Sequence, residues 1–164
     1  MSDGLRVALL EHDGRGSADA LVTGGGLEGF LLRPVTLPDA VLRLRKIGDR
    51  PGRVPGTLLA LARGGFDVAH AFTAQDAAAA IAWSAVTNRP VVYTQREPLS
   101  RANVANRRLR LATLRLALER SDAVVAPDEA TAESLRRWMA VEPRTIPSGS
   151  MSEHLELYSE LARR

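Results

Sequence analysis

The sequence of 164 residues contains no cysteine. Disulfide bonds and thiolate metal sites are therefore excluded, and a cytoplasmic location is expected. Aromatic residues make up only 4% of the chain. No segment approaches the roughly twenty apolar residues that a membrane span needs. The apolar stretch near the N-terminus is too short for a secretory signal, so we expect an ordinary globular protein of one domain.

Lysine is also scarce, because Lys46 is the single lysine among 22 basic residues. Arginine therefore supplies the positive charge, and the net charge is +3 against 19 acidic residues. A compositional bias of the source genome explains this usage. An anionic partner, such as a nucleotide, an anionic lipid or a nucleic acid, is the alternative. Only the distribution of charge along the chain separates the two.

The stretch from residue 66 to residue 97 organises the rest of the chain. Its apolar runs at 68–72 and 91–94 flank an alanine-rich segment, 75–86, that has no Gly or Pro inside it. This pattern predicts a strand, a helix and a parallel strand. Functional groups of parallel sheets lie just past the carboxyl ends of the strands. The residues expected there are His70, Phe72, Thr73, Gln95, Arg96 and Glu97.

Alternating elements are predicted along the remaining chain. Further strands are expected at 6–11, 30–35, 122–126 and 144–147, and helices at 17–22, 39–47, 57–63, 100–120, 128–139 and 150–164. Residues 48–56 contain three glycines and two prolines and are predicted to form a loop. The fold class is therefore α/β: a single Rossmann-like, doubly wound, mostly parallel sheet with helices on both faces. Residues 1–149 form the domain, and the helix 150–164 packs back on it.

The predicted helix 100–120 carries arginines at a spacing of seven residues: Arg101, Arg108 and Arg115. They form a ridge between two apolar stripes, one with Leu111, Leu114 and Leu118 and the other with Leu109 and Leu116. One interpretation is a solvated ridge whose side-chain stems cover apolar surface. The other is a peripheral contact with anionic lipid, at the inner membrane face, or with an acidic partner. We do not expect a nucleic-acid partner.

Four segments in order resemble the N-terminal domain of retaining glycosyltransferases of family 4, which have the GT-B fold. They are FDVAHAF, RPVVYTQRE, ERSDAVVAPDEATAESLRRW and RTIPSG. The family shows a D-V-V-H-A-H strand end, a P-V-V-x-T-x-H strand, an A-D-x-V-V-x-x-S segment and an I-P-N-G turn. The likeness spans about residues 6–149.

The resemblance implies an acceptor-binding half, because the nucleotide sugar binds a second domain in that family. No such domain follows Gly149, and the last segment resembles the helix that crosses back onto the first domain. The family's catalytic histidine falls on Arg96, which cannot act as a base. Asp128 stands where the family has serine, and Ser148 where it has asparagine. His70 is the first histidine of the H-A-H pattern.

The loop after the first strand carries His12, Gly14 and Gly16. The resemblance places glycines here near the donor phosphates, whereas the dinucleotide pattern G-x-G-x-x-G fails at Asp19. His70 is either a packed histidine or a ligand contact. Arg96 either pairs with Glu97 on the surface or clamps an anion. Trp83 and Trp138 are expected in the core. The three histidines are scattered, so neither a metal nor a cofactor is predicted.

Two functions remain open. One is an acceptor-side module, not catalytic alone, that binds a sugar or an anionic ligand or assists a partner glycosyltransferase. The other is a split glycosyltransferase whose donor-binding half is a separate polypeptide that binds the nucleotide sugar. A homodimer is also expected, because an apolar surface left uncovered without the second domain would find a partner.

Overall fold

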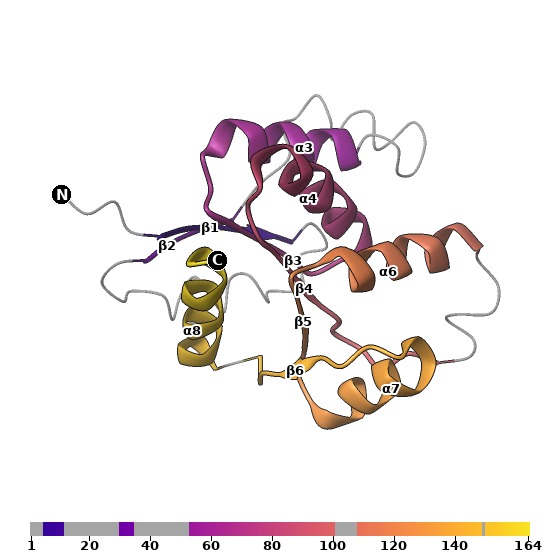
Figure 1. Cartoon of the computed structure of the whole chain (residues 1–164). Coiled ribbons are helices and arrows are strands. Elements are labelled where there is room, and N and C mark those ends of the chain that lie inside the picture. Colours follow the sequence, from indigo (N-terminus) through magenta and orange to yellow (C-terminus); the bar gives the residue numbers. More distant parts are fainter. Residues whose placement is uncertain (1–4, 12–29, 35–52, 101–107, 149) are drawn as a thin grey trace.

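The computed structural model describes residues 5–11, 30–34, 53–100, 108–148 and 150–164. One sheet of six strands, ordered β2-β1-β3-β4-β5-β6, runs through the molecule, and every neighbouring pair is parallel (Figure 1). The predicted α/β fold is confirmed. The strands are β1 (Leu5–Leu10), β2 (Phe30–Pro34), β3 (Val68–Ala71), β4 (Val91–Thr94), β5 (Ala123–Ala126) and β6 (Arg144–Thr145).

The central strands β3 and β4 are buried over their whole length. Alternate residues of each strand join different apolar clusters: Ala69 and Ala71 of β3 pack on one face, and Val68 packs on the other. This is the period of two that a strand imposes on its side chains. Burial on both faces explains why these strands read as continuous apolar runs.

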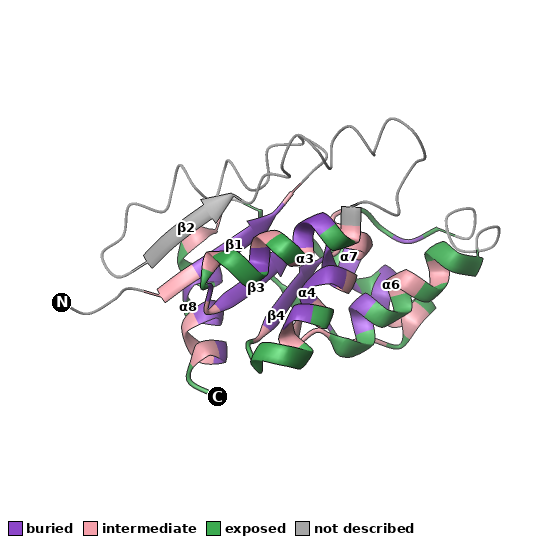
Figure 2. Cartoon of the chain, turned by 90° about the horizontal axis from the view of Figure 1, so that it is seen from above, coloured by how far each residue is buried: buried purple, intermediate pink, exposed green. Residues whose placement is uncertain are grey.

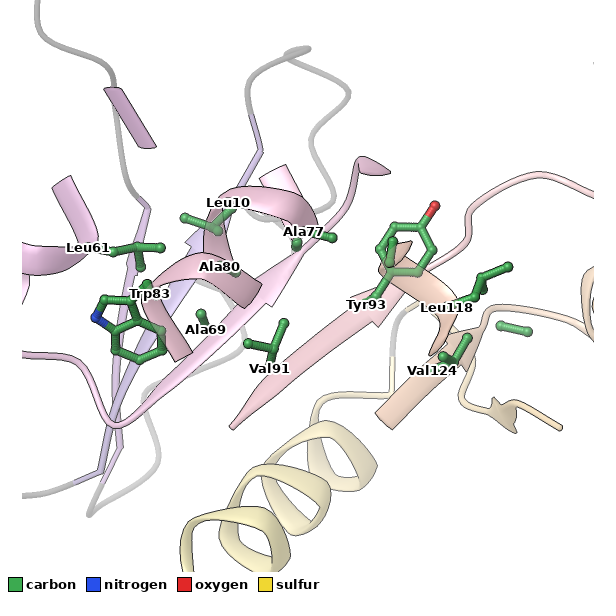
Figure 3. Packing of buried hydrophobic residues seen from close by; sticks show 14 of the residues in the cluster. Leu10, Leu61, Ala69, Ala77, Ala80, Trp83, Val91, Tyr93, Leu118 and Val124 are labelled. Carbon is green, nitrogen blue, oxygen red and sulfur yellow. The ribbon is translucent and has the colours of Figure 1, made fainter. Parts of the chain in front are cut away.

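Among the described residues, four helices cover the first face of the sheet: α3 (Arg53–Gly64), α4 (Ala74–Thr87), α6 (Arg108–Arg120) and α7 (Glu129–Met139). The alanines of α4 let that helix approach the strands closely, as Figure 3 shows for Ala77 and Ala80. Trp83 fills the space beside Leu61 of α3 and is 4% exposed. The prediction that Trp83 lies in the core is confirmed.

The opposite face is covered, among the described residues, by α8 (Met151–Ala162). In Figure 1 this helix lies across the sheet from α3 and α4. It buries Leu155, Leu157, Tyr158 and Leu161 against the sheet. Helices therefore lie on both faces, as the sequence predicts.

Side chains cap two of the helices that follow strands. The Thr73 hydroxyl accepts a hydrogen bond from the Asp76 amide at 3.2 Å, and the Asp128 carboxylate accepts one from the Thr131 amide at 2.7 Å. Each cap satisfies an amide that the helix itself leaves unpaired. Both helices end in the left-handed region, at Asn88 and Ala140.

Some boundaries and the burial of one residue differ from the prediction. The expected strand 144–147 ends at Thr145. Helix α3 begins at Arg53, so residues 53–56 of the expected loop are helical. Pro55 is tolerated because it lies in the first turn, where amides lack intrahelical partners. Trp138 is 41% exposed rather than buried, and the Arg137 guanidinium lies 5.6 Å from its ring centroid. The expected helices 17–22 and 39–47 lie outside the described residues.

Candidate functional site

A pocket of about 110 Å³ opens at the carboxyl edge of the sheet. Parallel sheets place their ligand sites at this edge. The ends of β3, β4, β5 and β6 and the first turn of α8 contribute to its wall. Apolar and polar groups share the lining, as is usual for small-molecule sites. The lining residues are Phe72, Thr94, Arg96, Pro127, Ile146, Ser148 and His154.

Arg96 is held from two sides. Its Nη2 lies 2.7 Å from Oε1 of Glu11, which follows β1, and its guanidinium carbon lies 5.1 Å from the centroid of Phe72. The side chains of Arg96 and Glu11 are only 15% and 5% exposed. The charge of Arg96 is therefore balanced by a carboxylate from a strand two places away in the sheet. The surface pair with Glu97 that the sequence suggested is not the ion pair found here.

His70 is a structural histidine in the centre of α8's contact with the sheet. Its Nδ1 lies 2.5 Å from the Tyr158 hydroxyl, and its Nε2 lies 2.7 Å from Oγ1 of Thr94. Both ring nitrogens are thus satisfied, although the ring is fully buried. Burial lowers the pKa of His70 well below 6.5, and the nearby His154 and Arg96 lower it further. The ring is neutral at pH 7.

His154 lines the pocket from the first turn of α8. Its Nδ1 lies 2.9 Å from the Ser150 carbonyl oxygen. Since a carbonyl only accepts, Nδ1 must carry the proton, and Nε2 of the neutral ring is an acceptor. Burial lowers the pKa of His154, against the opposing effects of the Ser150 carbonyl and of Glu153. The pocket thus has a neutral imidazole as one of its walls.

Several predicted site residues are used within the fold. Thr73 caps α4, and Asp128, which is exposed, caps α7. Gln95 accepts a hydrogen bond from the Tyr93 hydroxyl at 2.7 Å and donates one to the Glu97 carbonyl at 2.8 Å. Of the predicted residues, the pocket brings together Arg96 and Ser148, with Phe72 from the same strand end as His70.

Of the remaining predicted residues, the structure describes Arg108 and Arg115. Arg108 and Arg115 are exposed on α6. His12, Gly14, Gly16 and Arg101 lie outside the described residues. Within the described part of the chain, no group of three or more His, Asp or Glu side chains could hold a metal ion. No described helix is long and apolar enough to cross a bilayer.

Sequence reasoning missed the pairing of Glu11 with Arg96, the bond of Tyr158 to His70 and the position of His154. Glu11 had a usable signal, because it is the charged residue that directly follows an apolar strand. Tyr158 and His154 had a weaker one, since their spacing of four residues places them on one face of the last helix. That this face meets His70 depends on tertiary packing alone.

The family comparison fits this geometry. The description Glycosyltransferase Family 4 matches residues 2–150. The chain belongs to glycosyltransferase family 4. No curated protein matches it at the level of sequence.

Solved structures agree on the fold. A sucrose-phosphate synthase chain from Thermosynechococcus elongatus is 18% identical with a TM-score of 0.59, and the match covers 96% of this chain and 98% of that one. HepE from Anabaena, solved in complex with UDP and glucose, is 16% identical with a TM-score of 0.61. That match covers 96% of this chain and 50% of HepE. This family-4 chain thus spans half the length of HepE.

Within this family-4 chain, Arg96 stands where the resembling motif has histidine. A guanidinium stays protonated and cannot accept a proton from a hydroxyl group. His154 reaches the same pocket from α8 with an acceptor nitrogen. The imidazole of this pocket therefore comes from the last helix and not from the end of β4.

Proposed function

We propose that this chain is an acceptor-side glycosyltransferase domain that binds the hydroxyl groups of a sugar and needs a donor-binding partner for turnover. The observation that carries the proposal is the pocket at the carboxyl edge of the sheet. Three neutral hydrogen-bonding side chains line it, those of Thr94, Ser148 and His154. Sugar hydroxyls both donate and accept, which suits hydroxyl and imidazole partners.

The charge balance favours a neutral ligand over a phosphate. Arg96 is the cation of the lining, and Glu11 lies 2.7 Å from it. A phosphate would have to compete with that nearly buried carboxylate for the guanidinium. Phe72 and Ile146 supply apolar surface for the carbon face of a ring. The pocket is smaller than the roughly 300–1,000 Å³ of common ligand sites, which fits a single sugar unit better than a nucleotide sugar.

A partner enters the proposal because Arg96 replaces the histidine that the family resemblance expects, so proton transfer at that position is not available. HepE, a solved structure similar to this chain, holds UDP and glucose. We therefore expect binding without turnover from the chain alone. A nucleotide sugar would be held mainly by the partner polypeptide.

The test is a thermal-shift titration of the full chain with neutral mono- and disaccharides, UDP and UDP-glucose. A ligand that binds only the folded state raises the melting temperature by mass action. We expect a shift with a neutral sugar and its loss in Ser148→Ala and His154→Gln. Ser159→Ala is the matched control, because its hydroxyl bonds the Leu155 carbonyl within α8. A shift with phosphate-bearing ligands only would contradict the proposal.

The second candidate is a split glycosyltransferase in which this chain takes part in the chemistry. The neutral His154 favours it, since an imidazole acceptor beside a bound hydroxyl could act as a general base. The candidate predicts sugar transfer from a nucleotide sugar only after a donor-binding polypeptide is added. It also predicts that His154→Gln lowers the rate without lowering sugar binding to the same extent. Transfer that is unchanged in this variant would exclude the role.

Self-association is a separate prediction. We propose that the chain forms a homodimer, since an exposed apolar patch commonly marks a protein–protein contact. Analytical ultracentrifugation at several protein concentrations decides between a monomer and a homodimer.

A further inference from the structure

The outward face of α6 is unusual for its exposed leucines. Leu109 is 86% exposed and Leu116 is 40% exposed. They lie seven residues apart, so at about 100° per residue they share one side of the helix. Ala112, also exposed, lies between them. The opposite side, with Leu118 and the partly buried Leu114, packs on the core.

Positive charge gathers on the same helix. Arg108 directly precedes Leu109, Arg115 directly precedes Leu116, and Arg120 ends the helix; all three arginines are exposed. Glu119 is the acidic residue of the helix. Together with Arg110, the helix has four arginines and one glutamate. Its net charge thus equals the +3 of the whole chain. Among the described residues, none of these arginines is in an ion pair.

Some other arginines of the described residues are paired within the chain, whereas unpaired ones such as Arg63 and Arg163 lie on separate helices. Arg96, Arg136 and Arg144 each bond a carboxylate at 2.6–2.9 Å. A base-composition bias would spread arginine without regard to partners. The unpaired cluster on one helix therefore indicates a surface that meets negative charge from outside the chain.

We propose that this face of α6, formed by Leu109, Ala112 and Leu116 with Arg108 and Arg115 at its flank, docks on an anionic lipid bilayer. The apolar residues would enter the boundary of the acyl chains, and the arginines would reach the phosphates of the headgroups. Charge complementarity favours lipid over an uncharged partner. The exposed leucines favour it over nucleic acid, because phosphate neutralisation alone has no use for them.

This surface is distinct from the pocket. The pocket is lined from the ends of β3 to β6 and from α8, whereas α6 packs on α4 over the other face of the sheet. In Figure 2 the helix lies at one side of the molecule with much of its surface exposed. Docking through α6 thus leaves the pocket's own residues free to bind a sugar. The two proposals can fail independently.

The experiment is co-sedimentation of the full chain with vesicles of phosphatidylcholine alone or mixed with phosphatidylglycerol. We expect binding only to the mixed vesicles, and weaker binding at high salt because exposed charges are screened. Each arginine near an anionic surface contributes about a fivefold change in partitioning. The double variant Arg108→Gln, Arg115→Gln should therefore bind about 25-fold more weakly.

A second variant tests the apolar part. Leu109→Ser with Leu116→Ser keeps the charge and should also lose vesicle binding. Arg63→Gln with Arg163→Gln is the matched control, because it removes two exposed arginines from α3 and from the end of α8. This control should bind as the parent does. All the substituted residues are exposed, and circular dichroism verifies the fold of each variant.

Four outcomes would overturn the proposal. The first is that the chain does not bind the mixed vesicles, and the second is that the control variant loses as much binding as the arginine variant. The third is a homodimer that the leucine variant converts to a monomer, with no lipid binding. The fourth is tight binding to an oligonucleotide that the leucine variant leaves unchanged. The third would assign the face to a second copy of this chain. The fourth would assign it to nucleic acid.

Discussion

The two faces of the sheet are built in different ways. In the described part of the chain, the first is covered by four helices whose contacts are mainly apolar, with small alanines against the strands and one buried polar contact between Thr57 and Asp76. The second is covered, in the part of the chain that the structure describes, by α8, whose Tyr158 bonds the buried His70. Stability is thus distributed over many elements on one side and concentrated in twelve residues on the other. The concentrated side also forms a wall of the pocket.

The largest difference should appear when one large aromatic residue is removed from each face. Tyr158→Ala and Trp83→Ala should each cost about 3–5 kcal/mol of unfolding free energy, since both side chains are buried. We expect Tyr158→Ala to free α8 first, because Tyr158 both packs this helix on the sheet and bonds the buried His70. Native-state hydrogen exchange measures this. If the α8 amides of that variant exchange only by global unfolding, the stability of the second face does not depend mainly on Tyr158.

Removing only a hydroxyl compares the polar contacts of the two faces. Tyr158→Phe leaves Nδ1 of the fully buried His70 without its partner and should cost about 1–3 kcal/mol. Tyr93→Phe is the matched change on the first face. Its partner Gln95 is partly exposed and can bond water instead, so about 0.5–1.5 kcal/mol is expected. Urea unfolding gives both values. An equal loss of unfolding free energy in the two variants would show that the bond between Tyr158 and His70 stabilises the protein no more than the bond between Tyr93 and Gln95.

Acid should weaken the second face selectively. His70 and His154 have lowered pKa values in the folded protein, so the unfolded chain binds their protons more readily. Stability is therefore complete above the ordinary value of 6.5 and falls as the pH drops below it, by up to about 1.4 kcal/mol per pH unit for each histidine.

Urea titrations from pH 8 to pH 5 measure this slope. His154→Gln should make it shallower, whereas Tyr93→Phe should leave it unchanged, because the hydroxyl that it removes does not titrate in this range. A stability that is flat from pH 8 to pH 5 would contradict the assignment of two neutral buried histidines. Glu160, whose pKa is lowered by its bonds to Arg144 and Arg164, affects only more acidic conditions.

The smallest effect is expected at the rim of α8. Arg144 forms two hydrogen bonds with the Glu160 carboxylate, at 2.7 and 3.0 Å, and so links β6 to α8. Exposed ion pairs contribute little because water and salt screen them. Arg144→Gln should therefore leave the melting temperature nearly unchanged. A large decrease in melting temperature would mean that the Arg144–Glu160 pair, rather than Tyr158, stabilises the position of α8.

The order of elements follows from local sequence signals. Strands β3 and β4 and the alanine-rich α4 could be predicted because burial on both faces and helix propensity act within each segment. The start of α3 was missed because Pro55 in a first helical turn resembles a loop. Trp138 was misplaced because an aromatic residue in a helix gives no sign of which side is outside.

The pocket could be predicted only in part. The edge of the sheet and the presence of Arg96 and Ser148 followed from strand ends and from the family resemblance. The Glu11–Arg96 pair joins residues 85 positions apart, and no local pattern encodes such a pairing. His154 reaches the pocket because α8 crosses back over the sheet, which depends on the packing of the whole domain.

The contact between His70 and Tyr158 has a kinetic consequence. It joins residues 88 positions apart, and closing so long a loop costs conformational entropy before any contact stabilises it. The neighbouring elements β3, α4 and β4 are close in the chain and can associate early. We therefore expect φ-values near zero for substitutions in α8 and clearly higher values for Ala80→Gly in α4. The wall that His154 gives the pocket would then be completed only in the last step of folding.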